Sequence, residues 1–270
     1  MKIDLHIHST ASDGSLPPAA VVDAARAGGL HIIALADHDT IAGVAPAQQA
    51  AYGILHVIPA LELSTHHNGA ELHMLGYFVD LANAALVQYG ERARNARALR
   101  MREMIERLDA VGVRIDFEDV LAAAGERAHS LGRPHLARAM LQRGYVTTVS
   151  DAFDRYIGDN CPAFVPTRLI SPAEAIELIH AAVGVAVWAH PRTDQLAAEL
   201  SRFIEWGLDG VECYRPRVPH ADSERMAALT RDAGLLVTGG SDWHGDWQGR
   251  LGEFALERED VTAFLDAGGI

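Results

Sequence analysis

Residues 2–29, KIDLHIHSTASDGSLPPAAVVDAARAGG, contain a strand pattern followed by a helix pattern, and this pairing recurs along the chain. In KIDLHIH (2–8), side chains two residues apart point to the same face of an extended strand, so His6 and His8 would project together. A Pro-Pro pair precedes the next apolar run and a Gly-Gly pair ends it, which is typical of a helix start and stop. The stretch therefore predicts a β-α unit with two imidazoles at the end of its strand.

The same alternation returns in HIIALADHD (31–39) and, later, in three apolar runs that each follow a helix pattern: VAVWAHP (185–191), GVECY (210–214) and LLVTGGSDWH (235–244). Two further strands, LHVIPALELS and GAELHMLGYFV, are joined by the polar turn THHNG. Runs that are apolar along most of their length are typical of parallel strands covered by helices. We therefore expect an α/β fold with a seven-stranded (β/α)7 barrel, one strand fewer than the standard barrel.

Residues 83–165 break this rhythm, because they read as one long helix followed by shorter helices with no convincing strand between them. The predicted organisation is a barrel formed by residues 1–82 and 166–270, with residues 83–165 as a helical insertion between the fourth and fifth strands. We expect this insertion to overhang the barrel rim as a substrate cap.

The overall composition excludes several classes of protein. A formal net charge of −13 argues against broad attraction to a nucleic-acid backbone such as a DNA duplex. No apolar run approaches the length of about 18–20 residues that spans a bilayer. The N-terminus does not read as a secretion signal, and only Cys161 and Cys213 are present, so we expect a cytoplasmic protein without a disulfide framework.

Six histidines and three carboxylates stand at or just beyond the predicted strand ends. Any one of them has an ordinary structural explanation, such as a hydrogen-bonded core histidine or a turn aspartate. An apolar barrel cannot hold three carboxylates at one rim without cations, because burying unpaired charge is prohibitive. Together they predict a metal site, formed by His6, His8, Asp13, His38, Glu62, His73, His190, Asp242 and His244.

The chain resembles the PHP (polymerase and histidinol phosphatase) family, whose marks stand here in order as HIH, ADHD, ALELS, LHMLGY, AHP and GSDWH. This resemblance covers about residues 1–80 and 185–245. SLGRPHLARAM (130–140), with AFVPT (163–167) and RNARALR (94–100), resembles the branch of 3′,5′-nucleoside bisphosphate phosphatases and 5′-to-3′ exoribonucleases that act on short RNA. The resemblance implies a distorted seven-stranded PHP barrel.

The family's ligand scheme implies three divalent metal ions. The first would be held by His6, His8, Glu62 and Asp242; the second by Glu62 as a bridge, with His73 and His190; and the third by Asp13, His38 and His244. His73 is preferred over His66 and His67, because LHMLGY fits the family motif. Imidazole and carboxylate ligands without thiolate suit manganese, which we expect, with iron or zinc as alternatives. Asp37 is a candidate for orienting a metal-bound imidazole, with a simple structural role as the alternative.

The resemblance implies a metal-dependent phosphatase for a small anionic nucleotide, with a hydroxide that bridges two ions as nucleophile. We expect hydrolysis of the 3′-phosphate of nucleoside 3′,5′-bisphosphates, with catalytic roles for Asp13, Glu62, His190 and Asp242. Either Asp13 or a water on a metal would protonate the leaving group. The expected substrate contacts are Arg133, His135 and Arg100, with Arg97 and Arg192 as further possibilities. The alternatives are a 5′-3′ exoribonuclease on short RNA, a histidinol-phosphate-type phosphatase and a non-catalytic metal or nucleotide sensor.

Overall fold

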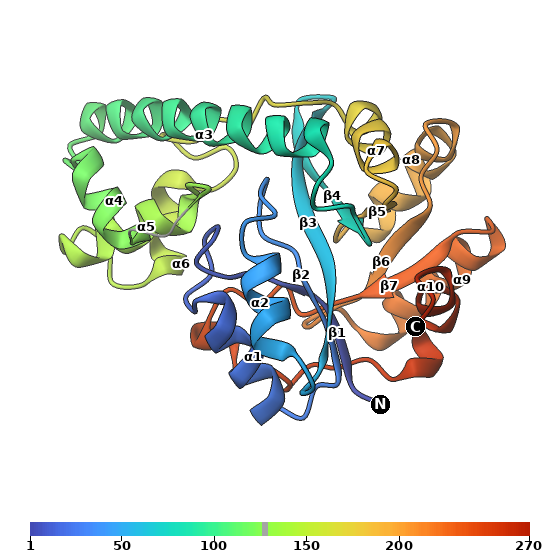
Figure 1. Ribbon diagram of the computed structural model, residues 1–270. Coiled ribbons are helices and arrows are strands. Elements are labelled where there is room, and N and C mark those ends of the chain that lie inside the picture. Colours follow the sequence, from blue (N-terminus) through green and yellow to red (C-terminus); the bar gives the residue numbers. More distant parts are fainter. Residues whose placement is uncertain (126–128) are drawn as a thin grey trace.

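A computed structural model describes residues 1–125 and 129–270 of the chain, and in these ranges seven strands form one sheet in chain order (Figure 1). The strands are β1 (Ile3–Ile7), β2 (Ile32–Leu35), β3 (His56–His67), β4 (Ala70–Tyr77), β5 (Val185–Trp188), β6 (Gly210–Tyr214) and β7 (Leu236–Gly239). Beyond β7, Trp243 forms a bridge with Ile7, so the sheet curls into a nearly closed barrel. The predicted α/β class and seven-stranded barrel are confirmed.

Six α-helices lie against the strands and follow the predicted β-α alternation: α1 (Pro18–Ala27), α2 (Val44–Ala51), α7 (Pro172–Ala181), α8 (Thr193–Glu205), α9 (His220–Asp232) and α10 (Thr262–Ala267). Figure 1 shows α1 and α2 beside β1 and β2, while α7 to α10 follow the strands at the other end of the sheet. Two 3₁₀ turns, η2 (Asp246–Gln248) and η3 (Arg258–Asp260), lie in the segment after β7.

β4 departs from the expected parallel arrangement, because it runs antiparallel to both β3 and β5. The turn before it is shorter than predicted: only Asn68 and Gly69 separate the strands, with φ of 49° and 84°. Positive φ at both central residues defines the tight hairpin turn that Asn-Gly favours. β3 and β4 therefore form a long hairpin, in which Glu62 pairs with Leu75, and His73 with Ser64, well inside the strands rather than at their ends.

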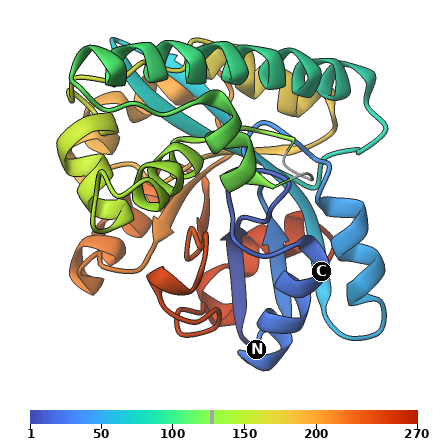
Figure 2. The same cartoon turned by 90° about the vertical axis from the view of Figure 1, so that its left-hand side faces the viewer.

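The chain between β4 and β5 forms a helical layer beside the barrel, with α3 (Ala84–Ala110), α4 (Phe117–Ala124), α5 (Arg133–Gln142), α6 (Val149–Ala152) and the π-helix η1 (Phe153–Ile157) (Figure 2). The start of α3 packs on the barrel core through Leu86 and Tyr89. Its later residues Met104 and Leu108 pack in a separate apolar cluster with α4 and α5. The predicted helices are confirmed, and the division into two domains stays a prediction.

The barrel core is filled by large apolar side chains from the strands and the helices outside them. Trp188 of β5 stacks on Phe203 of α8, with ring centres 4.1 Å apart and planes at 6°. The hydroxyl of Tyr77 donates to the carbonyl oxygen of Leu5 at 2.9 Å and so ties β4 to β1. Cys213 is buried and packs in the same apolar core. In the part of the chain described, we find no helix that is both long and apolar enough to cross a membrane.

Candidate metal centre

His6 and His8 form the centre of the site at the end of β1, and both side chains are fully buried. Their Nε2 atoms lie 3.1 Å apart. Oε2 of Glu62 lies 3.3 Å from each of these nitrogens. Oδ1 of Asp242 lies 3.5 Å from Nε2 of His6 and 3.2 Å from Nε2 of His8. These four side chains form the first donor group.

The spacing of the first donor group fits one divalent cation. Nitrogen and oxygen ligands about 2.0–2.2 Å from a tetrahedral ion lie about 3.3–3.6 Å from one another. The distances in the first donor group, from 3.1 to 3.5 Å, are close to these values. Two carboxylates this close together, one of them fully buried, would repel one another without a cation. The donor set and its geometry therefore suit a metal ion.

The second donor group consists of Glu62, His73 and His190. Oε1 of Glu62 lies 2.9 Å from Nδ1 of His73 and 2.9 Å from Nε2 of His190, and these two nitrogens are 3.2 Å apart. The two oxygens of Glu62 thus face different donor groups, which is the arrangement of a bridging carboxylate. His66 and His67 lie at the far end of β3, and His67 packs against Trp206.

The third donor group, formed by Asp13, His38 and His244, is wider. Oδ1 of Asp13 lies 3.3 Å from Nε2 of His244, and Oδ2 of Asp13 lies 4.0 Å from Nε2 of His38. Nδ1 of His38 also lies 3.1 Å from Oε2 of Glu62, so this ring stands between the first and third groups. The structure thus brings all nine predicted side chains into one cluster.

Three buried atoms in this cluster have close neighbours but no partner with hydrogen-bond geometry among the residues described: Oδ1 of Asp13, Nδ1 of His38 and Oε2 of Glu62. Buried polar atoms in native proteins are almost always paired, since an unpaired one costs about 1–3 kcal/mol. Each of these three atoms belongs to a donor group. Their lack of partners is what a cation site requires.

The electrostatics of the cluster also call for positive charge. Burial lowers the pKa of His8, but Asp242 and Glu62 outweigh it and raise that pKa to about 9. Burial likewise lowers the pKa of His73, which Glu62 and Glu71 nevertheless raise to about 10. The carboxylates around these imidazoles therefore favour a bound cation or a bound proton at the same positions.

Two of the side chains in the cluster come from strained backbone. His190 and Asp242 have φ of 34° and 53°, in the left-handed region that residues other than glycine seldom adopt. Such strain costs about 1–3 kcal/mol and persists where the surrounding structure enforces it, typically at functional sites. The turns after β5 and β7 thus aim both side chains at the barrel rim.

Glu212 contacts two residues of the site, and the sequence analysis did not identify it. Its Oε1 lies 2.9 Å from Nδ1 of His6, and its Oε2 accepts a hydrogen bond from the backbone N–H of His190 at 2.8 Å. Glu71 similarly lies 3.4 Å from Nε2 of His73. Glu212 is fully buried in the strand GVECY, and a carboxylate within such an apolar run is the signal that could have revealed it.

Asp37 bonds directly to no imidazole among the residues described, so of its two expected roles the orienting one is not supported. Its carboxylate accepts hydrogen bonds from the hydroxyls of Ser9 at 2.7 Å and Ser12 at 2.6 Å, and from the N–H groups of both residues. Asp37 therefore fixes the loop after β1, which carries Asp13. Its role is structural, which was the alternative.

A cavity of about 300 Å³ opens in front of the metal-binding cluster. Arg133 and Arg100 line it, as expected for substrate contacts. Nη1 of Arg133 lies 2.8 Å from Oδ1 of Asp159, whose side chain is 68% exposed, so this ion pair is weak. Nη2 of Arg100 lies 3.1 Å from Oε2 of Glu71.

Of the three other candidate contacts, His135 and Arg192 lie outside the cavity and Arg97 is engaged within the fold. His135 is fully buried and its Nδ1 accepts the N–H of Gly132 at 3.1 Å, so it caps α5 instead of lining the cavity. Burial lowers the pKa of His135 to about 4. Arg192 is exposed and pairs with Asp194 at 3.0 Å. Arg97 borders the cavity, but it is buried and its Nε donates to Oδ2 of Asp39 at 2.6 Å.

Comparisons with known proteins agree with this geometry. The PHP domain family model matches residues 4–143. The chain is 36% identical to a 5'-3' exoribonuclease from Haemophilus influenzae, over 90% of each chain. It is 32% identical to a 3',5'-nucleoside bisphosphate phosphatase from Chromobacterium violaceum, over 92% of this chain and 88% of that one.

Among solved structures, a metal-dependent phosphoesterase from Bifidobacterium adolescentis superposes with a TM-score of 0.88 at 35% identity. The superposition covers 98% of this chain and 96% of that one, so it includes the helical layer between β4 and β5 as well as the barrel.

Proposed function

The chain belongs to the PHP domain family of metal-dependent phosphoesterases, and from that premise we propose that it removes the 3′-phosphate of nucleoside 3′,5′-bisphosphates. As a hydrolase it is not a non-catalytic sensor, which was one of the alternatives. The observation that carries the proposal is that one cavity is lined both by side chains of the three donor groups and by Arg133 with Arg100. Two separated phosphates on one small molecule suit this arrangement.

The proposal includes three divalent ions, held by the first, second and third donor groups. Their nitrogen and oxygen donors without thiolate suit manganese, with iron and zinc as alternatives. Three such ions carry six positive charges, of which Asp13, Glu62 and Asp242 neutralise three. The surplus would attract a phosphate to a protein whose formal net charge is −13.

Bound divalent ions supply Lewis acidity toward a phosphoryl oxygen and lower the pKa of water. The chain's own residues provide the geometry. Glu62 keeps the first two donor groups at a set spacing, because each of its oxygens faces one of them. Asp242 completes the first donor group from the turn after β7, and His190 completes the second from the turn after β5. Asp13 lines the cavity beside His244; although burial raises its pKa, His244 and His38 hold that pKa well below its usual range, so Asp13 would be ionised and act as a ligand rather than as a proton donor.

The test is phosphate release by the manganese-loaded protein. We expect adenosine 3′,5′-bisphosphate to be hydrolysed to AMP and phosphate faster than AMP, histidinol phosphate or a short 5′-phosphorylated RNA. A preference for histidinol phosphate would replace the proposed substrate. Absence of turnover on all four, with metal bound, would reject the phosphatase proposal.

A second candidate is 5'-3' exoribonuclease activity on short RNA, favoured by the name of the Haemophilus influenzae relative. The 5′ end of an RNA offers a phosphate followed by a phosphodiester, so it presents the same two-anion pattern to the cavity. Faster turnover of the RNA than of the bisphosphate in the same assay would favour this candidate.

Replacing Glu212 with glutamine is expected to lower metal affinity about 10- to 100-fold, the usual effect of losing a carboxylate that orients a metal-bound histidine. The amide keeps the shape but holds His6 and His190 more weakly. Metal titration followed by calorimetry would measure the change. Glu224→Gln is the matched control, because Glu224 bonds to the Tyr214 hydroxyl instead. Equal affinities in both variants would contradict this role.

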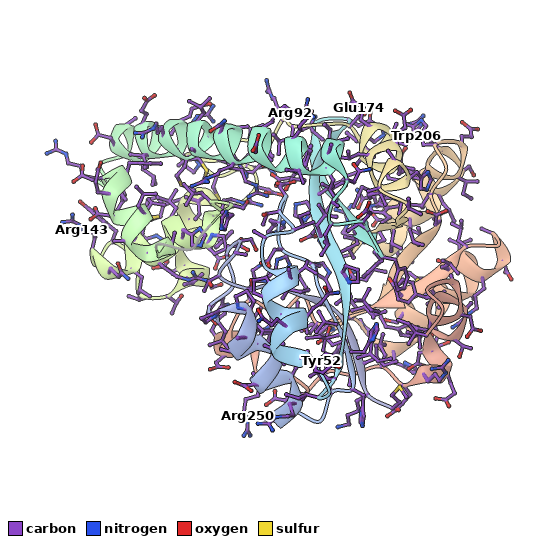
Figure 3. All side chains as sticks on the ribbon, in the orientation of Figure 1. Tyr52, Arg92, Arg143, Glu174, Trp206 and Arg250 are labelled. Carbon is purple, nitrogen blue, oxygen red and sulfur yellow. The ribbon has the colours of Figure 1, made fainter. Side chains whose placement is uncertain are left out.

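Arg133→Ala is expected to raise KM for adenosine 3′,5′-bisphosphate about 10- to 100-fold, since a hydrogen bond to a charged group contributes about 1.5–3 kcal/mol. KM for an aryl phosphate, which has no second phosphate, should not change. Arg143→Ala serves as control, because Arg143 lies at the far end of the insertion (Figure 3). An equal rise for both substrates would remove Arg133 from the specificity role.

A further inference from the structure

We propose that Trp247 is the surface on which the nucleobase of the substrate stacks, an inference that rests on the proposed function. The site described so far provides for metal ions and for phosphates. A nucleotide also carries a flat, apolar base, and the cavity contains a side chain of matching chemistry. Trp247 lines the same cavity as Asp13, His244 and Arg133.

Trp247 has no visible structural task in the fold. Its side chain is 50% exposed, whereas Trp188 and Trp243 are buried and Trp206 packs against the barrel core. Within the part of the chain described, Trp247 belongs to none of the apolar clusters. Tryptophan is enriched at binding interfaces, because its ring is apolar while its N–H can still reach a hydrogen-bond partner.

The indole is nevertheless held in place. Cζ of Arg138 lies 5.1 Å from the centre of its ring, within the range of a cation–π contact. Arg138 is itself anchored, because its Nη2 donates to the backbone oxygen of Asp13 at 2.6 Å. The indole also lies against Gly245, where an added Cβ would collide with the ring. The indole ring of Trp247 is therefore already oriented before a base binds.

Phe153 is the other aromatic residue of the cavity, and its surroundings differ. Its ring packs against the apolar cluster of the insertion. Cζ of Arg133 lies 5.6 Å from the ring centre. Phe153 is thus engaged both with the insertion and with the proposed phosphate-binding arginine. Trp247 lies in η2, after β7, and packs into no apolar cluster of the described residues, so it is the ring more open to a base.

Stacking on an aromatic side chain does not require a particular base, because every base has a π-face. The contact would favour nucleotides over other bisphosphates without selecting among bases. Alanine replacement of a stacking residue costs about 1–3 kcal/mol, which corresponds to about 5- to 150-fold in affinity.

The experiment compares two substrates. Trp247→Ala should raise KM for adenosine 3′,5′-bisphosphate about 5- to 150-fold and leave KM for base-free 1-deoxyribose 3,5-bisphosphate unchanged. Trp247→Phe should retain most of the affinity. Titration with adenosine 3′,5′-bisphosphate should quench the tryptophan fluorescence of the wild-type protein, and Trp247→Phe should abolish most of that quenching. Tyr52→Ala is the control, because Tyr52 is 90% exposed and lies near the end of the barrel away from the insertion (Figure 3).

An unchanged KM for both substrates in Trp247→Ala, or an equal rise for both, would overturn the inference. So would loss of base dependence in Phe153→Ala but not in Trp247→Ala. Should the wild-type protein hydrolyse neither substrate, the proposed function fails, and the quenching titration alone then decides whether Trp247 binds a base.

Discussion

Replacing Glu62 with glutamine is expected to lower kcat/KM for phosphate release by more than about 1000-fold. Loss of a carboxylate that only orients a metal ligand already lowers metal affinity or activity about 10- to 100-fold, and Glu62 is itself a proposed ligand. Glu62 is fully buried, and its two oxygens face two donor groups. The amide nitrogen of glutamine cannot bind a cation, so at least one group would lose a ligand. Metal analysis after dialysis should show fewer ions per chain than in the wild-type protein.

The fold should survive this change, since glutamine has the same shape and removes a buried charge. Thermal unfolding of the metal-depleted proteins would check this point. Glu174→Gln is the matched control: Glu174 belongs to the capping box of α7, at the molecular surface in Figure 3, and glutamine can also fill that position. Full metal content in Glu62→Gln, together with wild-type activity, would refute the bridging role.

Replacing Arg97 with methionine is expected to lower the free energy of unfolding by about 3–5 kcal/mol, because breaking a buried ion pair leaves a charge without its partner. Arg97 of α3 donates to Asp39 at 2.6 Å and to the Ser64 hydroxyl at 2.6 Å. Its Nη1 also donates to the backbone oxygen of Leu131 at 3.0 Å. Urea denaturation followed by circular dichroism would measure the loss.

Two further variants make this prediction specific. Arg92→Met removes an exposed arginine from the same helix, which points away from the barrel in Figure 3, and should leave stability nearly unchanged. Combining Arg97→Met with Asp39→Asn removes both charges and should restore part of the lost stability. A loss below about 1 kcal/mol, the value typical of exposed pairs, would show that Arg97 contributes only as a surface charge does.

The clustering of the nine candidate ligands was predictable from sequence because each lies in a short motif within or beside a strand. His6 and His8 are two residues apart on one strand, and Asp242 and His244 follow another. The alternation of strands and helices supplied the order of these motifs, and a barrel brings its strand ends to one rim. Local pattern and topology together were therefore sufficient for the cluster.

The direction of β4 was accessible but was not inferred. Asn68-Gly69 is a strong hairpin signal, and a two-residue connection can join only antiparallel strands. Treating all of THHNG as a loop concealed it. The apolar content of β4 did not indicate its direction, since a parallel and an antiparallel strand can be equally apolar.

The roles of Arg97, His135 and Asp37 could not be inferred in this way. Several arginines occur along α3, and the sequence does not indicate which of them meets the barrel. Arg97 is buried only because Asp39 and Ser64, far away in sequence, lie opposite. Asp37 likewise bonds to Ser9 and Ser12 through a contact between β2 and the loop after β1. Such assignments depend on tertiary packing.

β4 and β5 are hydrogen-bonded neighbours although more than a hundred residues separate them in the sequence. Their ladder, from Met74–Trp188 to Tyr77–Val185, uses backbone groups alone and is indifferent to what the intervening chain contains. The entropic cost of closing a loop rises only with the logarithm of its length, so a long connection between β4 and β5 destabilises the barrel little more than a short one. The outer part of the helical layer, such as α4, can therefore diverge or lengthen during evolution while this ladder stays intact, whereas α3 must keep Arg97 against Asp39.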